Sequence, residues 1–108
     1  MGEQVRILLA EPSLKYREQL VSTFTNEGFT VLCLEGAAAL QAVERDPLDL
    51  AVINLRFAGI DPLDLIQRAV QRNIPCLAVA ASFEGHEAMR ACRLGADSIW
   101  VHPIDMDR

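Results

Sequence analysis

The sequence of 108 residues lacks any apolar run close to the roughly 20 residues that cross a bilayer, so we expect no membrane span. Its first residues, Met-Gly-Glu-Gln-Val, lack the basic region and apolar stretch of a signal peptide. The three cysteines, Cys33, Cys76 and Cys92, form no CxxC pair and no Cys/His cluster at metal-ligand spacing. We therefore expect a cytoplasmic protein whose cysteines are reduced and buried, two in strands and one on the apolar side of a helix.

Basic stretches and common catalytic motifs are also missing. The net charge is −5 and no stripe of Lys or Arg is present, so direct nucleic-acid binding by this domain is not expected. The sequence contains no GxGxxG, no Walker A pattern, and no serine or cysteine beside a usable base. These absences argue against an enzyme.

What is present is a pattern of short apolar runs alternating with amphipathic segments, in a chain that is 51% apolar and 23% charged. This composition and length are typical of one globular domain. The predicted strands are Val5–Ala10, Phe29–Leu34, Asp49–Ile53, Cys76–Ala80 and Ser98–Val101. The predicted helices run from the N-cap Ser13 to about Glu27, from Gly36 to Asp46, from Pro62 to Arg72, and through about Leu94.

Strands that alternate with single helices should be parallel and joined by right-handed crossovers, which predicts a three-layer α/β sandwich. In the first helix, an apolar face is predicted from Leu14, Leu20, Val21 and Phe24. In the third, the buried stripe is predicted to be Leu63, Ile66, Ala69 and Val70. Gly28, Gly95 and the left-handed Asn73 are expected to end helices.

Asn54 is the single polar residue at the end of the apolar third strand. Open parallel sheets bind ligands outside the carboxyl ends of their strands, so this position is a candidate site, but an amide is neither nucleophile nor base. Asp61 and Asp64 could be a catalytic carboxylate pair. Their spacing across Pro62 favours instead a helix N-cap followed by an acid in the first turn.

Six segments carry a resemblance to a known family, in order and at close to its spacing: Ile7–Pro12, Glu27–Val31, Asp49–Asn54, Gly59–Asp61, Gly95–Asp97 and His102-Pro103. Over essentially its whole length the chain resembles the receiver domain of bacterial two-component response regulators. The resemblance implies a flavodoxin-like (CheY-like) sandwich with a parallel sheet in the order 2-1-3-4-5. We expect the fifth helix, which the family carries, to be missing or truncated here.

The resemblance also implies a phosphorylation site, whose residues have mostly changed. The acidic pair that holds magnesium in the family corresponds to Ala10 and Glu11, and only Glu11 keeps its chemical character. The phosphoacceptor aspartate corresponds to Asn54. The hydroxyl residue, the lysine and the switch aromatic correspond to Ala80, His102 and Ile99. We therefore expect weak or absent Mg²⁺ binding and no other cofactor, because Mg²⁺ prefers several anionic oxygen ligands.

Two residues near this site have open alternatives. His102 could pair with Glu11 and titrate near neutral pH, but a histidine that fills the lysine's place with one hydrogen bond is the favoured interpretation. Trp100, in the last strand, could belong to the core or anchor a partner, since aromatic residues dominate interface hot spots.

The resemblance implies signalling. We expect an atypical, degenerate receiver that acts as a phosphorylation-independent interaction module, with a protein partner, its own output domain or a second copy as the contact. The alternatives are a receiver phosphorylated at another acid, such as Glu11 or Asp61, and a flavodoxin-like domain that binds a small ligand. Excision from the N-terminal part of a longer regulator is the favoured explanation for the missing helix, ahead of a shared dimer face and completion by a downstream segment.

Overall fold

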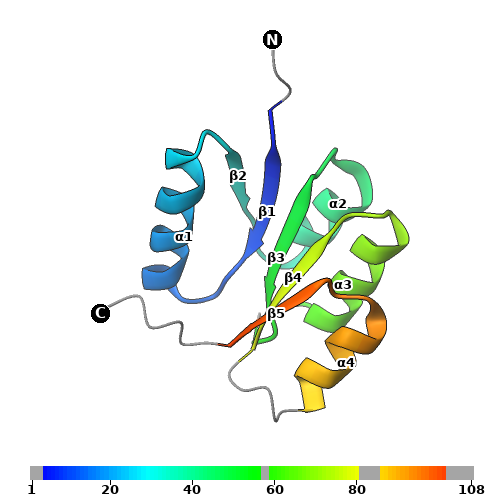
Figure 1. Ribbon diagram of the computed structural model, residues 1–108. Coiled ribbons are helices and arrows are strands. Elements are labelled where there is room, and N and C mark those ends of the chain that lie inside the picture. The colour runs from blue at the N-terminus through cyan, green and yellow to red at the C-terminus, as the bar shows by residue number, and fades with distance from the viewer. Residues whose placement is uncertain (1–3, 57–58, 81–85, 102–108) are drawn as a thin grey trace.

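The protein is a three-layer α/β sandwich in the computed structural model, which describes residues 4–56, 59–80 and 86–101. Its five strands are parallel and lie in the order β2-β1-β3-β4-β5, which confirms the predicted fold and sheet order (Figure 1). The strands are β1 (Arg6–Ala10), β2 (Thr30–Cys33), β3 (Leu50–Asn54), β4 (Cys76–Ala80) and β5 (Ser98–Val101).

Four helices cover the sheet within the described ranges. They are α1 (Leu14–Asn26), α2 (Gly36–Arg45), α3 (Pro62–Gln71) and α4 (His86–Leu94). Helix α1 lies on one face of the sheet, and the other three helices lie on the opposite face (Figure 1). None of the helices in the described part of the chain is long and apolar enough to cross a bilayer.

Local sequence signals account for where the helices begin and end. The side chains of Ser13 and Asp61 accept hydrogen bonds from the first turns of α1 and α3, from Tyr16 N at 3.5 Å and Leu63 N at 3.0 Å. Gly28 follows α1 with φ +89°, and Asn73 follows α3 with φ +61°. Both residues adopt the left-handed conformation that ends helices, as predicted.

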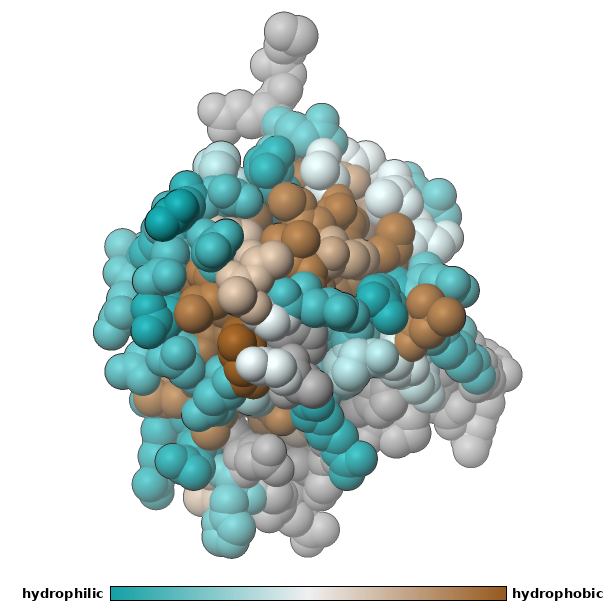
Figure 2. Space-filling model, turned by 180° about the vertical axis from the view of Figure 1, so that it is seen from behind, coloured by the Kyte–Doolittle hydropathy of each residue, from teal (hydrophilic) through white to brown (hydrophobic). Residues whose placement is uncertain are grey.

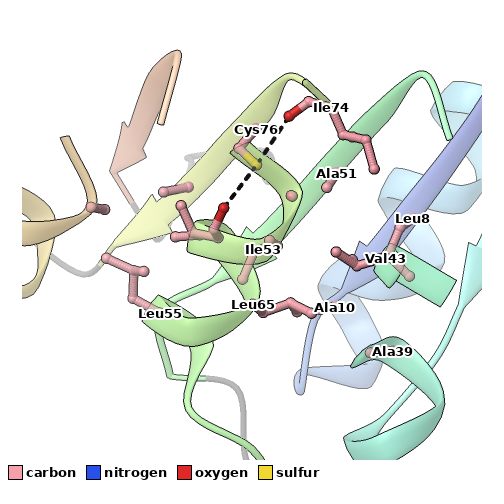
Figure 3. Packing of buried hydrophobic residues seen from close by; sticks show 14 of the residues in the cluster. Leu8, Ala10, Ala39, Val43, Ala51, Ile53, Leu55, Leu65, Ile74 and Cys76 are labelled. Atoms are coloured by element: carbon pink, nitrogen blue, oxygen red, sulfur yellow. Dashed lines mark hydrogen bonds between the residues drawn. The ribbon is translucent and has the colours of Figure 1, made fainter. Parts of the chain in front are cut away.

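The core divides into two clusters because successive strand residues point to opposite faces. In β1, Ile7 and Leu9 pack toward α1, whereas Leu8 and Ala10 pack toward α2 and α3. The larger cluster lies between the sheet and α2–α4, and Figure 3 shows part of it with Ile53 and Leu65. The carboxyl edge, where these packed strands end, holds Glu11 and Asn54.

One predicted helix face is wrong in part. Leu14 is 62% exposed, whereas Leu20 is buried. Leu14 is the first residue of α1, whereas the partly buried Val21 and Phe24 pack with Leu20 against the smaller core cluster. The predicted stripe in α3 is confirmed for Ile66 and Ala69, which are buried, and Leu63 and Val70 pack partly buried against the same cluster. Leu65 is buried with them.

The prediction that all three cysteines are buried is also wrong. Cys76 is buried, but Cys33 and Cys92 are exposed. Cys33 lies at the end of the edge strand β2. Cys92 lies on the solvent side of α4, whereas Ala88 and Ala91 of the same helix face the core.

The side of the molecule opposite to the view in Figure 1 exposes apolar side chains among polar ones (Figure 2).

Candidate functional site

The first candidate residues meet at the carboxyl edge of the sheet, where β1 and β3 end side by side. In the parallel register Ala10 lies opposite Ile53, so the next residues, Glu11 and Asn54, become neighbours. Their exposed fractions are 4% and 5%, and they are the two buried polar or charged residues in the described part of the chain. Two predicted site residues 43 positions apart thus form one buried pair.

A closed hydrogen-bond network joins this pair to the adjacent loops. Asn54 Nδ2 donates to Glu11 Oε1 at 2.9 Å, and the backbone N–H of Ser13 donates to Glu11 Oε2 at 2.9 Å. Asn54 Oδ1 accepts the backbone N–H of Arg56 at 2.8 Å. Both carboxylate oxygens and both ends of the amide therefore have partners, as buried polar groups require.

The network also determines how the Asn54 amide is oriented. A carboxylate is an acceptor only, and a backbone N–H is a donor only, so a flipped amide would face like with like at both ends. The amide NH₂ therefore points at the carboxylate of Glu11. This NH₂ group carries a partial positive charge. If both positions held carboxylates, a proton or a cation would be needed between them to offset their repulsion.

The sequence did not point to the backbone groups of Ser13 and Arg56 as parts of this network. Ser13 was predicted only as the N-cap of α1, and it fills that role with its side chain. A usable signal was present, however. Glu11 is the first residue after β1, Asn54 is the last residue of β3, and the 2-1-3 order makes these two strands adjacent. Each residue stands just before the loop that it binds.

The two alanines at the site contribute no polar atom. Ala10 is fully buried and its side chain packs in the larger core cluster (Figure 3). Ala80 is the last residue of β4, 5% exposed, and belongs to the same cluster. Asn54 lies opposite Val79 in the register, so Ala80 is one position beyond its neighbour and offers only a methyl group there.

The remaining candidates lie on β5 and beyond it. Ile99 is half-buried against the larger cluster, and Trp100 is half-buried against the smaller cluster on the α1 side. Trp100 therefore contributes to the core, and its role as a partner anchor stays a prediction. His102 lies outside the described residues, so its proposed pairing with Glu11 also stays a prediction.

Asp61 and Asp64 each have a structural role in α3. Asp61 Oδ1 accepts the N–H of Leu63, which makes Asp61 the N-cap of α3. Asp64 Oδ2 accepts from Arg68 Nε at 3.2 Å, and Arg68 also pairs with Glu44 at 2.6 Å. These two aspartates organise α3, as the capping interpretation predicted.

The donor atoms at the carboxyl edge do not fit the magnesium ion that the resemblance implies there. Magnesium needs octahedral coordination by hard oxygen ligands. Glu11 is the one carboxylate of the pair, Ala10 offers no side-chain oxygen, and Asn54 turns its NH₂ toward the carboxylate. Within the described ranges, no three His, Cys, Asp or Glu side chains are grouped as metal ligands.

Comparison with known proteins identifies regulatory proteins as relatives. The chain is 33% identical over 108 residues to the regulatory protein VanRc of Enterococcus gallinarum, covering 97% of this chain and 46% of that protein. It is 27% identical over 106 residues to the transcriptional regulatory protein TctD of Salmonella typhimurium, covering 95% and 47%. The chain thus spans about half the length of these curated relatives. No family model matches the chain.

The fold agrees with this result. A response regulator receiver domain (CheY-like) from Methanospirillum hungatei superimposes with a TM-score of 0.83, at 17% identity, over 95% of this chain and 85% of that one. The strand order and the four described helices agree with this fold, and the sequence alignment to the relatives covers nearly the whole chain. The chain is a receiver domain of the two-component response-regulator type.

Proposed function

We propose that this receiver domain works without phosphoryl transfer, as a protein-interaction module of a signalling protein. The observation that carries the proposal is the buried Glu11–Asn54 pair, in which an amide occupies the phosphoacceptor position and is held by a carboxylate. A receiver that uses phosphorylation needs a carboxylate nucleophile here, a cation that bridges it to the phosphoryl oxygens, and fixed donors for the developing charge.

Each of these three requirements is weakened at this edge of the sheet. The amide nitrogen of Asn54 is a poor nucleophile, and it already donates to Glu11. Ala80 cannot donate a hydrogen bond to a phosphoryl group. Because Asn54 supplies a hydrogen-bond donor to Glu11, the pair is satisfied without a cation, and we infer that Mg²⁺ binding is weak.

The proposed partner is a protein surface, either an output segment of the same regulator or a separate protein. The relatives are named as regulatory proteins about twice as long as this chain, which supports a role beside a further segment. The net charge of −5 disfavours direct contact between this domain and nucleic acid.

Incubation with acetyl phosphate and MgCl₂, followed by intact mass measurement, tests the proposal. We expect no stable adduct of about 80 Da, the mass of one phosphoryl group, whereas a receiver with an acceptor aspartate should give one under the same conditions. A stoichiometric adduct would overturn the proposal. The variants Glu11→Gln and Asp61→Asn would then show which of these acids, if either, carries the phosphoryl group.

A further inference from the structure

A hollow of about 580 Å³ opens between α3 and α4, away from the Glu11–Asn54 pair. Leu63 and Asp64, in the first turn of α3, line one wall, next to the capping residue Asp61. Arg90, Arg93 and Leu94 of α4 line the other wall. Both helices pack on the same face of the sheet, which sets the spacing between the walls.

The charged side chains of the two walls differ in whether they form hydrogen bonds or ion pairs within the domain. Asp61 caps α3, and Asp64 is paired with Arg68. Arg90 and Arg93 are exposed, and neither forms an ion pair or hydrogen bond with any residue that the structure describes. The unpaired guanidinium groups of the hollow therefore lie together on its α4 wall, in a chain whose net charge is −5.

The two guanidinium groups are three residues apart on α4, so they lie on the same side of the helix. Arginine binds carboxylates through two parallel N–H donors, which makes such a pair suited to acidic side chains. Leu63 and Leu94 add half-buried apolar surface to the hollow, and Met89, 53% exposed, lies one turn before Arg93. A free anion would use the arginines but not this apolar surface.

We propose that the α3–α4 hollow binds an acidic, apolar segment of a partner protein, with carboxylates on Arg90 and Arg93 and an apolar side chain against Leu63 and Leu94. This inference rests on the proposed function, because it names the surface through which an interaction module would act. Charge complementarity favours an acidic segment, and the apolar lining favours a polypeptide over phosphate.

Titration of the ¹⁵N-labelled chain with synthetic peptides tests this inference. The probe is a 14-residue peptide of alternating Leu and Glu pairs, compared with the same peptide carrying Gln for Glu or Ser for Leu. We expect amide shifts confined to α3 and α4 with the Leu/Glu peptide, and at least tenfold weaker binding for both altered peptides. The double variant Arg90→Gln/Arg93→Gln should lose binding tenfold or more, whereas the control Arg45→Gln, an exposed arginine on α2, should not.

Several results would overturn the inference: no shifts at the hollow, equal loss in Arg45→Gln, or binding by inorganic phosphate that matches the peptide's. The same titration after acetyl phosphate treatment separates this inference from the proposed function. Peptide binding that appears only with a phosphoryl adduct would keep the hollow as a site and reject phosphorylation-independent action. Absence of both binding and adduct would reject the hollow alone.

Discussion

The carboxylate of Glu11 accepts the N–H of Ser13 and the amide NH₂ of Asn54, and both donors lose their partner in Glu11→Ala. A buried donor without a partner costs roughly 1–3 kcal/mol, so we expect the free energy of unfolding to fall by about 2–4 kcal/mol. Urea denaturation measures this loss. Glu18→Ala, on the exposed side of α1, is the control and should change stability by less than about 0.5 kcal/mol. Equal losses in the two variants would contradict a supporting role for Glu11.

The cysteines differ sharply in their environments. Burial, with a smaller contribution from the nearby Asp97 carboxylate, raises the pKa of the Cys76 thiol to about 12. Partial burial also raises the pKa of the Cys33 thiol, and the positive charge of Arg17 lowers it by a smaller amount. Cys33 is nevertheless exposed to solvent. Since the thiolate is the reactive form, Cys76 should resist iodoacetamide at pH 8 in the folded protein, while Cys33 and Cys92 are alkylated.

Peptide mapping by mass spectrometry checks this order of reaction, with urea-unfolded protein as the control in which all three cysteines react. Alkylation of Cys76 at the rate of Cys92 in the native protein would contradict the buried position.

The raised pKa of Cys76 also affects the stability of the protein at high pH. The unfolded thiol, with a pKa near 9.0, ionises before the folded one, so the stability that Cys76 contributes is lost as the pH rises above about 9.

Among the elements, the loop after β3 and the start of α2 approach each other through two glycines. Gly59 has φ +95°, and a Cβ there would lie 3.3 Å from the Cα of Gly36. Gly59→Ala should therefore lower the free energy of unfolding by about 2 kcal/mol, from backbone strain and from this contact. Gly28→Ala is the matched control, because its φ is +89° but nothing lies within 4 Å, and it should lose only about 1 kcal/mol. Equal losses would show that the contact does not matter.

The elements were largely predictable from sequence, because their signals are local. The fourth and fifth strands were predicted with the bounds that the structure shows, Cys76–Ala80 and Ser98–Val101. Burial on individual faces was less predictable. Leu14 is exposed although its seven-residue spacing from Val21 predicts a place on the apolar face of α1, and Cys33 is exposed at the end of the edge strand β2.

At the candidate site, too, the residues could be predicted from the sequence, but their contacts could not. The sequence predicted Glu11 and Asn54 as residues of the site, with Asn54 at the phosphoacceptor position that the resemblance implies. Their mutual hydrogen bond was not, because it depends on the register between β1 and β3 and on which way an amide turns. Local patterns carry no information on either point until the strands are paired.

For the molecule as a whole, the Glu11–Asn54 pair predicts what happens when Asn54 is replaced with aspartate. Asn54→Asp places two carboxylates together in a buried site, so at pH 7 we expect a loss of about 1–3 kcal/mol in the free energy of unfolding. Repulsion raises the folded-state pKa of one carboxyl, so the folded state binds the extra proton and the loss shrinks as the pH falls through that raised pKa. Urea denaturation at pH 7 and pH 5 measures both effects.

Asn26→Asp, at the exposed end of α1, is the control and should show neither the large loss nor its recovery at low pH. We also expect Asn54→Asp to accept little phosphoryl group from acetyl phosphate, because Ala10 and Ala80 remain. Efficient phosphorylation of this single variant would show that the surrounding site is still competent, and that the amide alone silences it.

The central claim is that a satisfied amide–carboxylate pair has replaced the phosphorylation site. The most direct measurement follows the side-chain NH₂ resonances of Asn54 in ¹⁵N-labelled protein during titration with MgCl₂ and beryllofluoride, a phosphoryl mimic. We predict that these resonances, and the amides of Ser13 and Arg56, stay in place through millimolar Mg²⁺. Saturable shifts centred on Asn54 and spreading to α4 and β5 would contradict the claim.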